Sequence, residues 1–508
     1  MYIGSIIFVI VSKFQKRIKS VNLTFALCLT FVLSSCGLQT AVEDNDTKER
    51  IGFKGDFYSY EFVWQYGRNR EWEEDVIFMV SEFLETHPLL SDRLAHVVEL
   101  SSNDNPETIH VFSERSFYNS KIRDDFIYMA NNLITQIPNL SDFEIAVGLS
   151  RIIAILDDSH SHINITVQRG IERLPILLTN HFESHFDPLY LDASQIKCWP
   201  HIRTAYVGLG DILNTRLIAV NGIDIEEIYR RIRPLFSHER GVENSFRLRS
   251  GGSSIVFRQI LQYVDVIRDE YIIPLTVIDI NDNVFTVYSP FVSSLEEVDL
   301  IAHQIDFTTF FWASRSNENY WFKHLPDENI MYFRYWSSQE MPNRPSLQFS
   351  EDLRNEIIQL GGVNAFVFDA RANSGGYLTN GVEELILWAM DEFNRSLLGY
   401  IYVIVDQWSY SMGAVVALIW QKFVEDVKIV GSPTSGSLNF FATTIRAGNL
   451  PNSQLTFGIS TGFAENAPNV EANSAVIPDV IVVRTLEDYI NHHDAVIETI
   501  MQRLNLEN

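Results

Sequence analysis

Residues 400–430 read YIYVIVDQWSYSMGAVVALIWQKFVEDVKIV, and this stretch decides the fold class. Residues 400–405 form a continuous apolar run, which is typical of a strand buried on both faces of a parallel sheet. Residues 412–424 follow as an apolar helix, and residues 427–430 as another short apolar strand. Strand, helix and strand in this rhythm predict an α/β layered domain with a mainly parallel core.

Ser411 lies where the first of these strands gives way to the helix. A serine at this position meets free backbone N–H groups and the positive end of the helix dipole, and both favour developing negative charge. Gly413 and Ala414 are small, so the helix can approach the strand closely. The turn is suited to present a nucleophile, although a plain helix N-cap uses the same residue type.

Three further segments have the residues of tight turns or loops next to predicted strands. Residues 365–376, AFVFDARANSGG, are an apolar strand that ends in paired glycines. Gly375 and Gly376 let backbone amides turn towards a ligand without interference from a Cβ atom, as an oxyanion hole requires. Residues 430–436, VGSPTSG, form a tight loop, and residues 475–480, AVIPDV, precede a terminal strand and helix.

In this order the segments resemble the motifs of the C-terminal-processing and tricorn-like serine peptidases, the S41 family. The family pattern is a D-x-R-x-N-x-G-G strand end, a serine turn, a G-x-x-T-x-G loop and a G-V-x-P-D segment. Residues 156–161, LDDSHS, are similar to the family's L-x-D-G-H-T element, and residues 217–228 resemble part of a peptide-binding PDZ module. The resemblance covers roughly residues 57–504.

The departures from the pattern bear on the mechanism. Processing peptidases carry a lysine after T-x-G and a glutamine four residues later, where this chain has Ser437 and Phe441. A neutral serine cannot act as a general base, which excludes a Ser–Lys dyad. Ala414 replaces the acidic residue that often closes the serine motif, and Ala475 replaces the glycine before V-x-P-D. The chain therefore resembles the tricorn-type branch, in which a histidine is the base and a glutamate orients it.

The resemblance assigns the catalytic roles. Ser411 is the nucleophile and His160 the general base, because histidine transfers protons near neutral pH. Ser159 helps to position the imidazole, and Glu471 orients it, with Glu465 as the fallback. The oxyanion donors are the backbone N–H groups of Met412 and of Gly375 or Gly376.

His160 has two other interpretations, as a structural side chain or as a metal ligand. With His162, Asp157 and Asp158 it forms a short His/Asp cluster of the kind that holds metal ions. We expect the base role, and therefore neither a metal nor a cofactor.

Composition and charge exclude one class of partner. Hydrophobic residues make up 46% of the 508 residues and charged residues 20%, an ordinary globular balance. With 39 Lys and Arg against 65 Asp and Glu, the net charge is −26, and such a surface repels phosphate backbones. We expect no nucleic-acid partner. Of the three cysteines, Cys28 and Cys36 fall in the N-terminal leader, so Cys198 is left alone and no disulfide framework is expected.

The N-terminus has the layout of a secretory signal. Basic residues precede an apolar run at 21–33, and LSSC at 33–36 resembles the lipobox of bacterial lipoproteins. We expect residues 1–35 to be a signal peptide and Cys36 to carry a lipid that anchors the chain to a cell membrane, outside the cytoplasm. An uncleaved N-terminal anchor is the alternative, but the run is short for a membrane span.

The predicted architecture is a multidomain α/β fold. Residues 36–56 are expected to be a flexible tether, and residues 57–170 a helical domain. Residues 171–292 are expected to be a PDZ-like β-rich domain, and residues 293–508 an S41-type catalytic domain of the ClpP/crotonase-like class.

The predicted function is a serine-type peptidase that cleaves protein or peptide substrates through an acyl-enzyme. One alternative is a lipid-anchored peptide-binding protein without catalysis, which the absent lysine and glutamine motivate. The other is an α/β-hydrolase esterase, whose acid and histidine follow the serine and here correspond to Asp479 and His492.

Overall fold

The computed structural model describes residues 65–101, 109–166, 170–182, 196–239, 241–302, 311–315, 317–442, 445–467 and 474–507. Met1–Glu61 and Phe62–Asn508 form separate units, and only the second contains described residues. The predicted signal peptide, Cys36 and the tether therefore lie outside the described residues. Among the helices that are described, none combines the length and the apolar character needed to cross a membrane.

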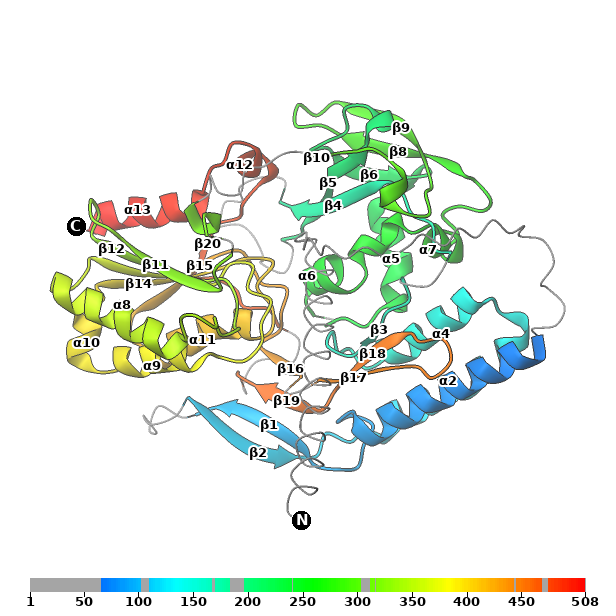
Figure 1. Cartoon of the computed structure of the whole chain (residues 1–508), viewed down its shortest axis with the longest axis horizontal. Helices are drawn as coiled ribbons and strands as arrows, with labels where there is room; N and C mark the ends of the chain where they lie inside the picture. The colour runs from blue at the N-terminus through cyan, green and yellow to red at the C-terminus, as the bar shows by residue number, and fades with distance from the viewer. Residues whose placement is uncertain are drawn as a thin grey trace, which may run out of the picture. The chain divides into compact units, whose positions relative to one another are not determined.

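A six-stranded sheet forms the centre of the C-terminal region (Figure 1). In spatial order its strands are β11 (Tyr320–Leu325), β12 (Ile330–Tyr335), β13 (Ala365–Asp369), β14 (Tyr400–Val405), β15 (Val427–Gly431) and β20 (Val480–Ile481). Only β11 pairs antiparallel, so the core is mainly parallel as the sequence predicts. β13 and β14 coincide with the apolar runs at 365–369 and 400–405, because both faces of the sheet are covered.

Helices pack on both faces of this sheet. One face carries α8 (Ser346–Leu360), α9 (Asn380–Ala389) and α11 (Met412–Phe423), and the other carries α13 (Ala495–Glu507) (Figure 1). Along β13, Phe366 and Phe368 belong to the first core while Val367 belongs to the second, as the two-residue period of a strand requires. Two short helices, α10 (Glu392–Ser396) and α12 (Leu486–Ile490), complete the region. The predicted α/β class is confirmed.

The N-terminal region is mainly helical. It contains α2 (Gln65–Thr86), α3 (Ser120–Gln136) and α4 (Asp142–Ala154). The N-cap of α4 is Ser141, whose hydroxyl accepts from the Glu144 N–H (3.3 Å). The Glu144 carboxylate accepts in return from the Ser141 N–H (2.8 Å), which completes a capping box.

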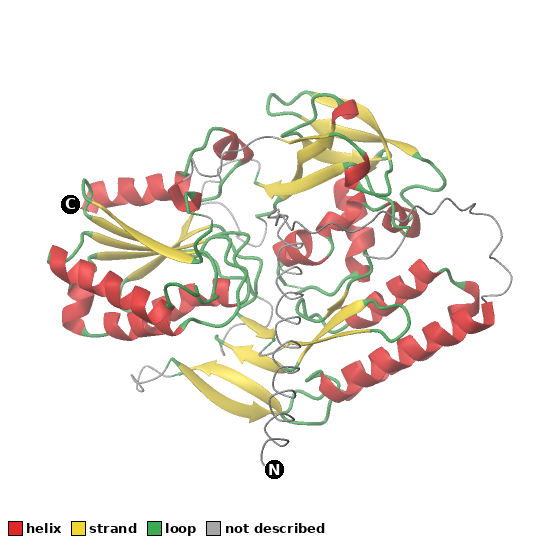
Figure 2. Ribbon diagram, in the orientation of Figure 1, coloured by secondary structure: helices red, strands yellow, loops and turns green. Residues whose placement is uncertain are grey.

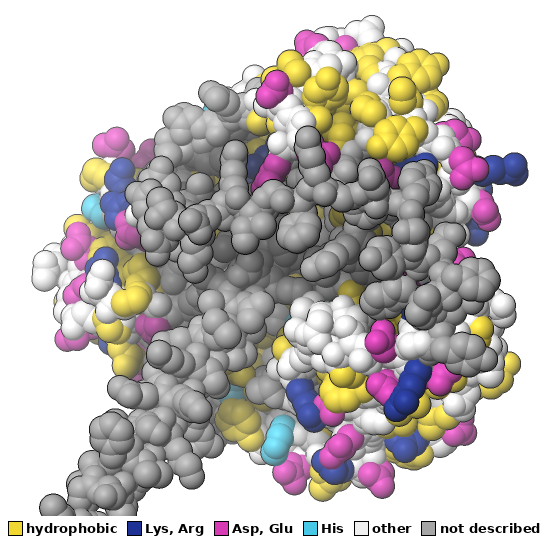
Figure 3. Space-filling model, turned by 45° about the vertical axis from the view of Figure 1, so that its right-hand side comes forward, with side chains coloured by type: hydrophobic (Ala, Val, Ile, Leu, Met, Phe, Trp, Pro, Cys, Tyr) yellow, Lys and Arg dark blue, Asp and Glu magenta, His cyan; other side chains and the backbone are white. Residues whose placement is uncertain are grey.

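The middle region is a twisted antiparallel sheet with helices against it (Figure 2). Its elements are β4 (Ile176–His181), β5 (Trp199–Tyr206), β6 (Arg216–Val220), β7 (Ile223–Asp224), β8 (Ile272–Ile278), β9 (Val284–Pro290), β10 (Leu300–Ala302), α5 (Ile225–Ile232), α6 (Glu243–Ser245) and α7 (Arg258–Tyr263). Its core is continuous with that of α2 and α4. Hydrophobic side chains gather on the upper part of the face in Figure 3, in the area of β8 and β9, where Ile272, Val284 and Tyr288 are exposed.

Two small sheets join the C-terminal chain to the N-terminal region. One has the order β16 (Asn439–Phe441), β19 (Gly462–Glu465), β1 (Ala95–Leu100) and β2 (His110–Arg115). The other has the order β17 (Ile445–Asn449), β18 (Thr456–Ser460) and β3 (His162–Ile163). The second pairing sets Gly458 opposite His162 and so fixes the chain just after His160. The end of α4 is thereby held beside the loops that follow β15.

Candidate active site

Ser411 occupies a strained turn between β14 and α11. Its φ of 53° and ψ of −129° lie in a region that only glycine adopts freely, and a non-glycine residue there costs on the order of 1–3 kcal/mol. Although Ser411 stands at the N-cap position of α11, its side chain makes no capping hydrogen bond. Ser411 is half-buried. The side chain of Ser411 therefore does not serve as a plain N-cap of α11.

Two glycines pack directly against this turn. A Cβ atom on Gly375 would lie 2.6 Å from the Ser411 Cβ, and one on Gly436 would lie 2.8 Å from the Ser411 nitrogen. Both distances are too short for real side chains, so glycine is required at these two approaches. The structure thus brings the loop after β13 and the loop after β15 together at Ser411.

The predicted oxyanion donors differ in their availability. Met412 is the first residue of α11, and its N–H has no acceptor among the described residues. The Gly375 N–H donates to the Asn373 Oδ1 (2.9 Å) and is therefore already engaged. Gly376 forms an isolated parallel β-bridge with Ser338. Met412, at the positive end of the helix dipole, is a donor that this conformation leaves available.

Hydrogen bonds hold the glycine loop and the serine turn together. The Tyr410 N–H donates to the Asn373 carbonyl (3.0 Å), and the Ala372 N–H donates to the Asp406 Oδ1 (2.8 Å). At the base of the loop, Asp369 and Arg371 form a buried ion pair (2.6 Å). Burial opposes the ionisation of Asp369, but Arg371 and Arg334 outweigh it and lower the pKa of Asp369 to about 2. The loop is therefore a rigid support for Ser411.

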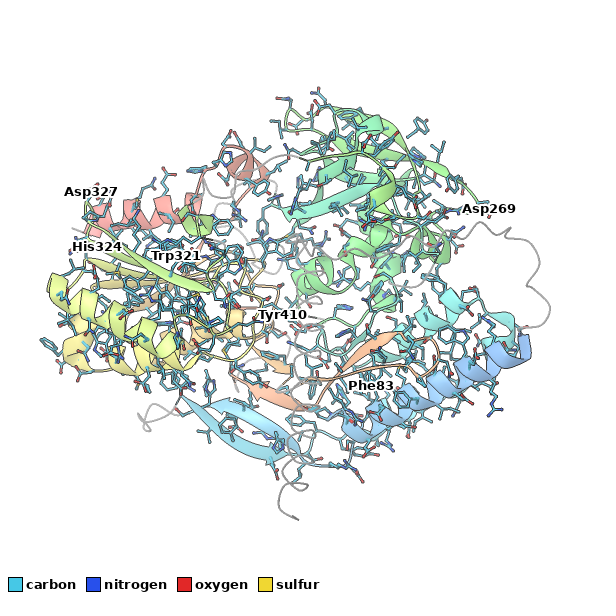
Figure 4. The ribbon with its side chains drawn as sticks, in the orientation of Figure 1. Phe83, Asp269, Trp321, His324, Asp327 and Tyr410 are labelled. Carbon is cyan, nitrogen blue, oxygen red and sulfur yellow. The ribbon has the colours of Figure 1, made fainter. Side chains whose placement is uncertain are left out.

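His160 lies against the residue that precedes Ser411. Its ring stacks on the Tyr410 ring with a centroid distance of 4.8 Å, and on the Phe440 ring at 5.1 Å. The His160 Nδ1 and the Tyr410 hydroxyl are hydrogen-bonded at 3.1 Å. Tyr410 lies near the centre of the view in Figure 4, among the loops between the six-stranded sheet and the helical region. Folding has thus joined two positions that are 250 residues apart.

The segment before His160 is anchored by buried polar contacts. The His160 N–H donates to the Asp158 Oδ1 (2.9 Å), and the Asp158 Oδ2 lies 3.3 Å from the His87 Nε2. Burial tends to raise the pKa of Asp158, but the hydrogen bond and charge of His87 outweigh it, so the pKa is lowered. The His162 Nδ1 contacts the His160 carbonyl (3.0 Å), and burial lowers the pKa of His162. Within the described ranges, no group of three or more His, Cys, Asp or Glu side chains is arranged to hold a metal ion.

Ser159 contacts an acidic residue that the sequence analysis missed. Its hydroxyl donates to the Glu239 Oε1 (2.7 Å) and forms a short hydrogen bond with the Tyr410 hydroxyl. The Glu239 Oε2 accepts from the N–H (2.7 Å) and the hydroxyl (2.5 Å) of Ser437. Its Oε1 lies 4.0 Å from the His160 Nδ1. Glu239 is buried, and burial raises its pKa to about 7 although the bonds from Ser437 and Ser159 oppose the rise.

No local motif marks Glu239. It lies in the middle region, 80 residues from Ser159 and 198 from Ser437. The one signal in the sequence is indirect: Ser437 stands where the motif pattern that the chain resembles has a lysine, and a serine hydroxyl there can bond another side chain.

The two glutamates predicted to orient His160 lie elsewhere or outside the described residues. Glu471 belongs to residues 468–473, which are outside them. Glu465 lies on β19 and forms an ion pair with Arg115 (2.9 Å). The structure therefore places Gly375 against Ser411 and Met412, and it places Ser159 and His160 against the adjacent Tyr410. It does not pair Glu465 with the histidine.

The described residues define an α/β protein of several sheets, with a serine turn at the carboxyl edge of a mainly parallel sheet. No protein-family model and no curated protein matches the sequence. Among solved structures, mature CPAF complexed with lactacystin has a TM-score of 0.51 at 10% identity, over 86% of this chain and 98% of that chain. Mature CPAF alone has a TM-score of 0.51 at 12% identity, over 87% and 98%. The photosystem II D1 C-terminal processing protease has a TM-score of 0.33 at 11% identity, over 81% and 92%. The chain therefore shares the fold of mature CPAF.

Proposed function

We propose that this chain is a serine-type peptidase of the S41 kind, which cleaves peptide bonds through an acyl-enzyme on Ser411 with His160 as the general base. The observation that carries the proposal is the Ser411 turn itself, strained, uncapped and half-buried, beside a tyrosine on which His160 stacks. Strain in such a turn is stored where geometry serves function. The shared fold with mature CPAF supports the same assignment.

The chemistry follows from the roles of these groups. His160 takes the hydroxyl proton as the Ser411 Oγ attacks the carbonyl carbon, and the Met412 N–H stabilises the oxyanion at the N-terminus of α11. The imidazolium then gives its proton to the amine nitrogen as the C–N bond breaks. The amine departs, and the acyl-enzyme remains. The same histidine then takes a proton from water as the water oxygen attacks the acyl carbon, and the imidazolium returns that proton to the Ser411 Oγ as the bond between Oγ and the acyl carbon breaks. The products are a carboxylic acid and an amine.

Within the S41 peptidases, we assign the chain to the tricorn-type branch, in which a histidine rather than a lysine is the general base. It is supported by Ser437, which replaces the lysine and whose hydroxyl is hydrogen-bonded to Glu239.

The location outside the cytoplasm and the lipid on Cys36 rest on the sequence of residues 1–36. Mass spectrometry of the mature N-terminus tests the lipid, and an unmodified Met1 contradicts it in favour of an uncleaved anchor.

Covalent labelling tests the activity. A fluorophosphonate probe should label the wild-type chain at Ser411 and should not label the Ser411→Ala variant, since only an activated serine reacts. Ser120→Ala is the matched control, because Ser120 also begins a helix, α3, but is exposed and outside the site. Lactacystin, with which mature CPAF forms a complex, is a second probe. Equal labelling of the wild type and Ser411→Ala contradicts the proposal, and no labelling of either favours the peptide-binding alternative.

No observation favours the esterase alternative. The Asp479 Oδ2 accepts from the Ile429 N–H (2.8 Å) and from the Gln421 Nε2 (3.1 Å). Gln421 lies ten residues along α11 from Ser411, which corresponds to about 15 Å of helix. Asp479 therefore lies near the C-terminal end of α11, far from Ser411.

A further inference from the structure

A continuous chain of hydrogen bonds connects Glu239 to His160. From the Glu239 Oε1 it passes to the Ser159 hydroxyl (2.7 Å), then to the Tyr410 hydroxyl, and then to the His160 Nδ1 (3.1 Å). We call these four side chains the Glu239 relay. Three of its members belong to distant parts of the chain, so the relay exists only in the folded protein.

When Glu239 is ionised, only one assignment of donors and acceptors along the relay is possible. A carboxylate only accepts, so the Ser159 hydroxyl donates its proton to the Oε1. The Ser159 oxygen must then accept from the Tyr410 hydroxyl, whose oxygen in turn accepts from the His160 Nδ1–H. The neutral imidazole is thereby fixed with its proton on Nδ1, and its Nε2 carries the lone pair that a general base needs.

The opposite direction gives the wrong tautomer. If the group at the Oε1 position becomes a donor, the Ser159 oxygen accepts a hydrogen bond from it. The Ser159 hydroxyl then donates its proton to the Tyr410 oxygen. The Tyr410 hydroxyl then donates to the His160 Nδ1, which places the imidazole proton on Nε2. A histidine in that state cannot remove a proton through Nε2.

We propose that Glu239 is the positioning acid of this site, and that it sets the tautomer of His160 through Ser159 and Tyr410. The proposal rests on the proposed function, and it assigns to the middle region a role that the family resemblance places at residues 465–471. Ser437 completes the arrangement, since its N–H and hydroxyl hold the other carboxylate oxygen in place.

The relay predicts a pH response. Burial raises the pKa of Glu239 to about 7, and the negative charge of Asp158 adds to the rise. His160 and Tyr410 are the other titratable groups that face this carboxyl. Protonation of Glu239 turns its carboxyl into a donor, so kcat should fall as the pH drops through this pKa.

The decisive variant is Glu239→Gln, which is nearly isosteric. The Ser437 N–H can only donate, so it selects the amide oxygen for the position of Oε2. The amide NH2 group then occupies the position of Oε1 and donates to Ser159, which reverses the relay. We expect kcat to fall by up to about ten-thousandfold, the loss that a wrong histidine tautomer produces in a serine protease, with KM within about twofold.

A double-mutant cycle separates this role from a structural one. Tyr410→Phe removes the hydroxyl in the middle of the relay, so Glu239→Gln should have no further effect on kcat in that background. Glu144→Gln is the matched control, because Glu144 also accepts from the N–H and hydroxyl of one serine, Ser141, but does so at the exposed start of α4. It should retain wild-type kcat.

Histidine ¹⁵N spectra give a readout that does not depend on turnover. His160, assigned with a His160→Gln variant, should be the Nδ1–H tautomer above pH 8 in the wild type and the Nε2–H tautomer in Glu239→Gln. Ser159→Ala, which also breaks the relay, serves if Glu239→Gln does not fold.

Wild-type kcat and tautomer in Glu239→Gln overturn the proposal. So does loss of kcat in Glu471→Gln together with its retention in Glu239→Gln. Failure of the proposed function is distinguished separately, because it appears as absence of fluorophosphonate labelling in the wild type.

Discussion

Replacing Gly375 with alanine tests whether the glycine loop sets the geometry of Ser411. The new Cβ atom would lie 2.6 Å from the Ser411 Cβ, 2.9 Å from the Tyr410 carbonyl oxygen and 3.1 Å from the Met412 nitrogen. Carbon atoms in contact prefer about 3.5–4.0 Å, so the serine must move by about 1 Å. Two of the three neighbours are backbone atoms, so no rotamer change relieves the contact.

The variant should lose activity out of proportion to its loss of stability. Gly375 has a φ of +98°, and an alanine held at positive φ costs about 1–2 kcal/mol of folding free energy. A displacement of about 1 Å at a reacting group lowers the rate about a hundredfold. We therefore expect kcat for a peptide substrate, and the rate of fluorophosphonate labelling, to fall by about a hundredfold or more.

Gly361→Ala is the matched control. Gly361 ends α8 in the left-handed conformation with a φ of +71°, and a Cβ atom there meets nothing within 4 Å. It should show a comparable loss in the free energy of unfolding, measured by chemical denaturation, with wild-type kcat. Wild-type kcat and labelling in a folded Gly375→Ala variant would refute the reasoning that this loop positions the nucleophile.

The remaining predictions concern stability and pH. The pKa of Glu239 is raised to about 7 from 4.5, so its ionisation destabilises the fold as the pH rises through this window. Glu239→Gln should therefore gain on the order of 2–3 kcal/mol relative to the wild type at pH 8, but not at pH 4, in urea denaturation. A loss of stability at pH 8 would contradict this assignment. Asp369 has the opposite shift, because Arg371 and Arg334 hold its pKa at about 2 although burial opposes ionisation. Its contribution, on the order of 2 kcal/mol, is present above about pH 4 and is lost as the pH falls towards 2. Acid unfolding of Asp369→Asn should have a correspondingly weaker pH dependence, and an unchanged one would rule out this contribution.

Local sequence patterns determined much of the C-terminal α/β region of the fold. β13 and β14 were predicted residue for residue, because strands buried on both faces must be continuously apolar. The serine turn and the paired glycines were also found, since a strand–turn–helix junction has its own residue preferences. The roles of Cys36 and Glu471 stay predictions, because both lie outside the described residues.

Only the tertiary structure decided which side chains of the site form hydrogen bonds with one another. Three different regions of the chain supply Ser159, Glu239 and Tyr410, and no periodicity or spacing links them. The engagement of the Gly375 N–H by Asn373 and the missing cap at Ser411 were equally invisible in the sequence. Sequence patterns report the solvent exposure and backbone preference of neighbouring residues. Hydrogen bonds between distant side chains arise from packing, which the printed order of residues does not contain.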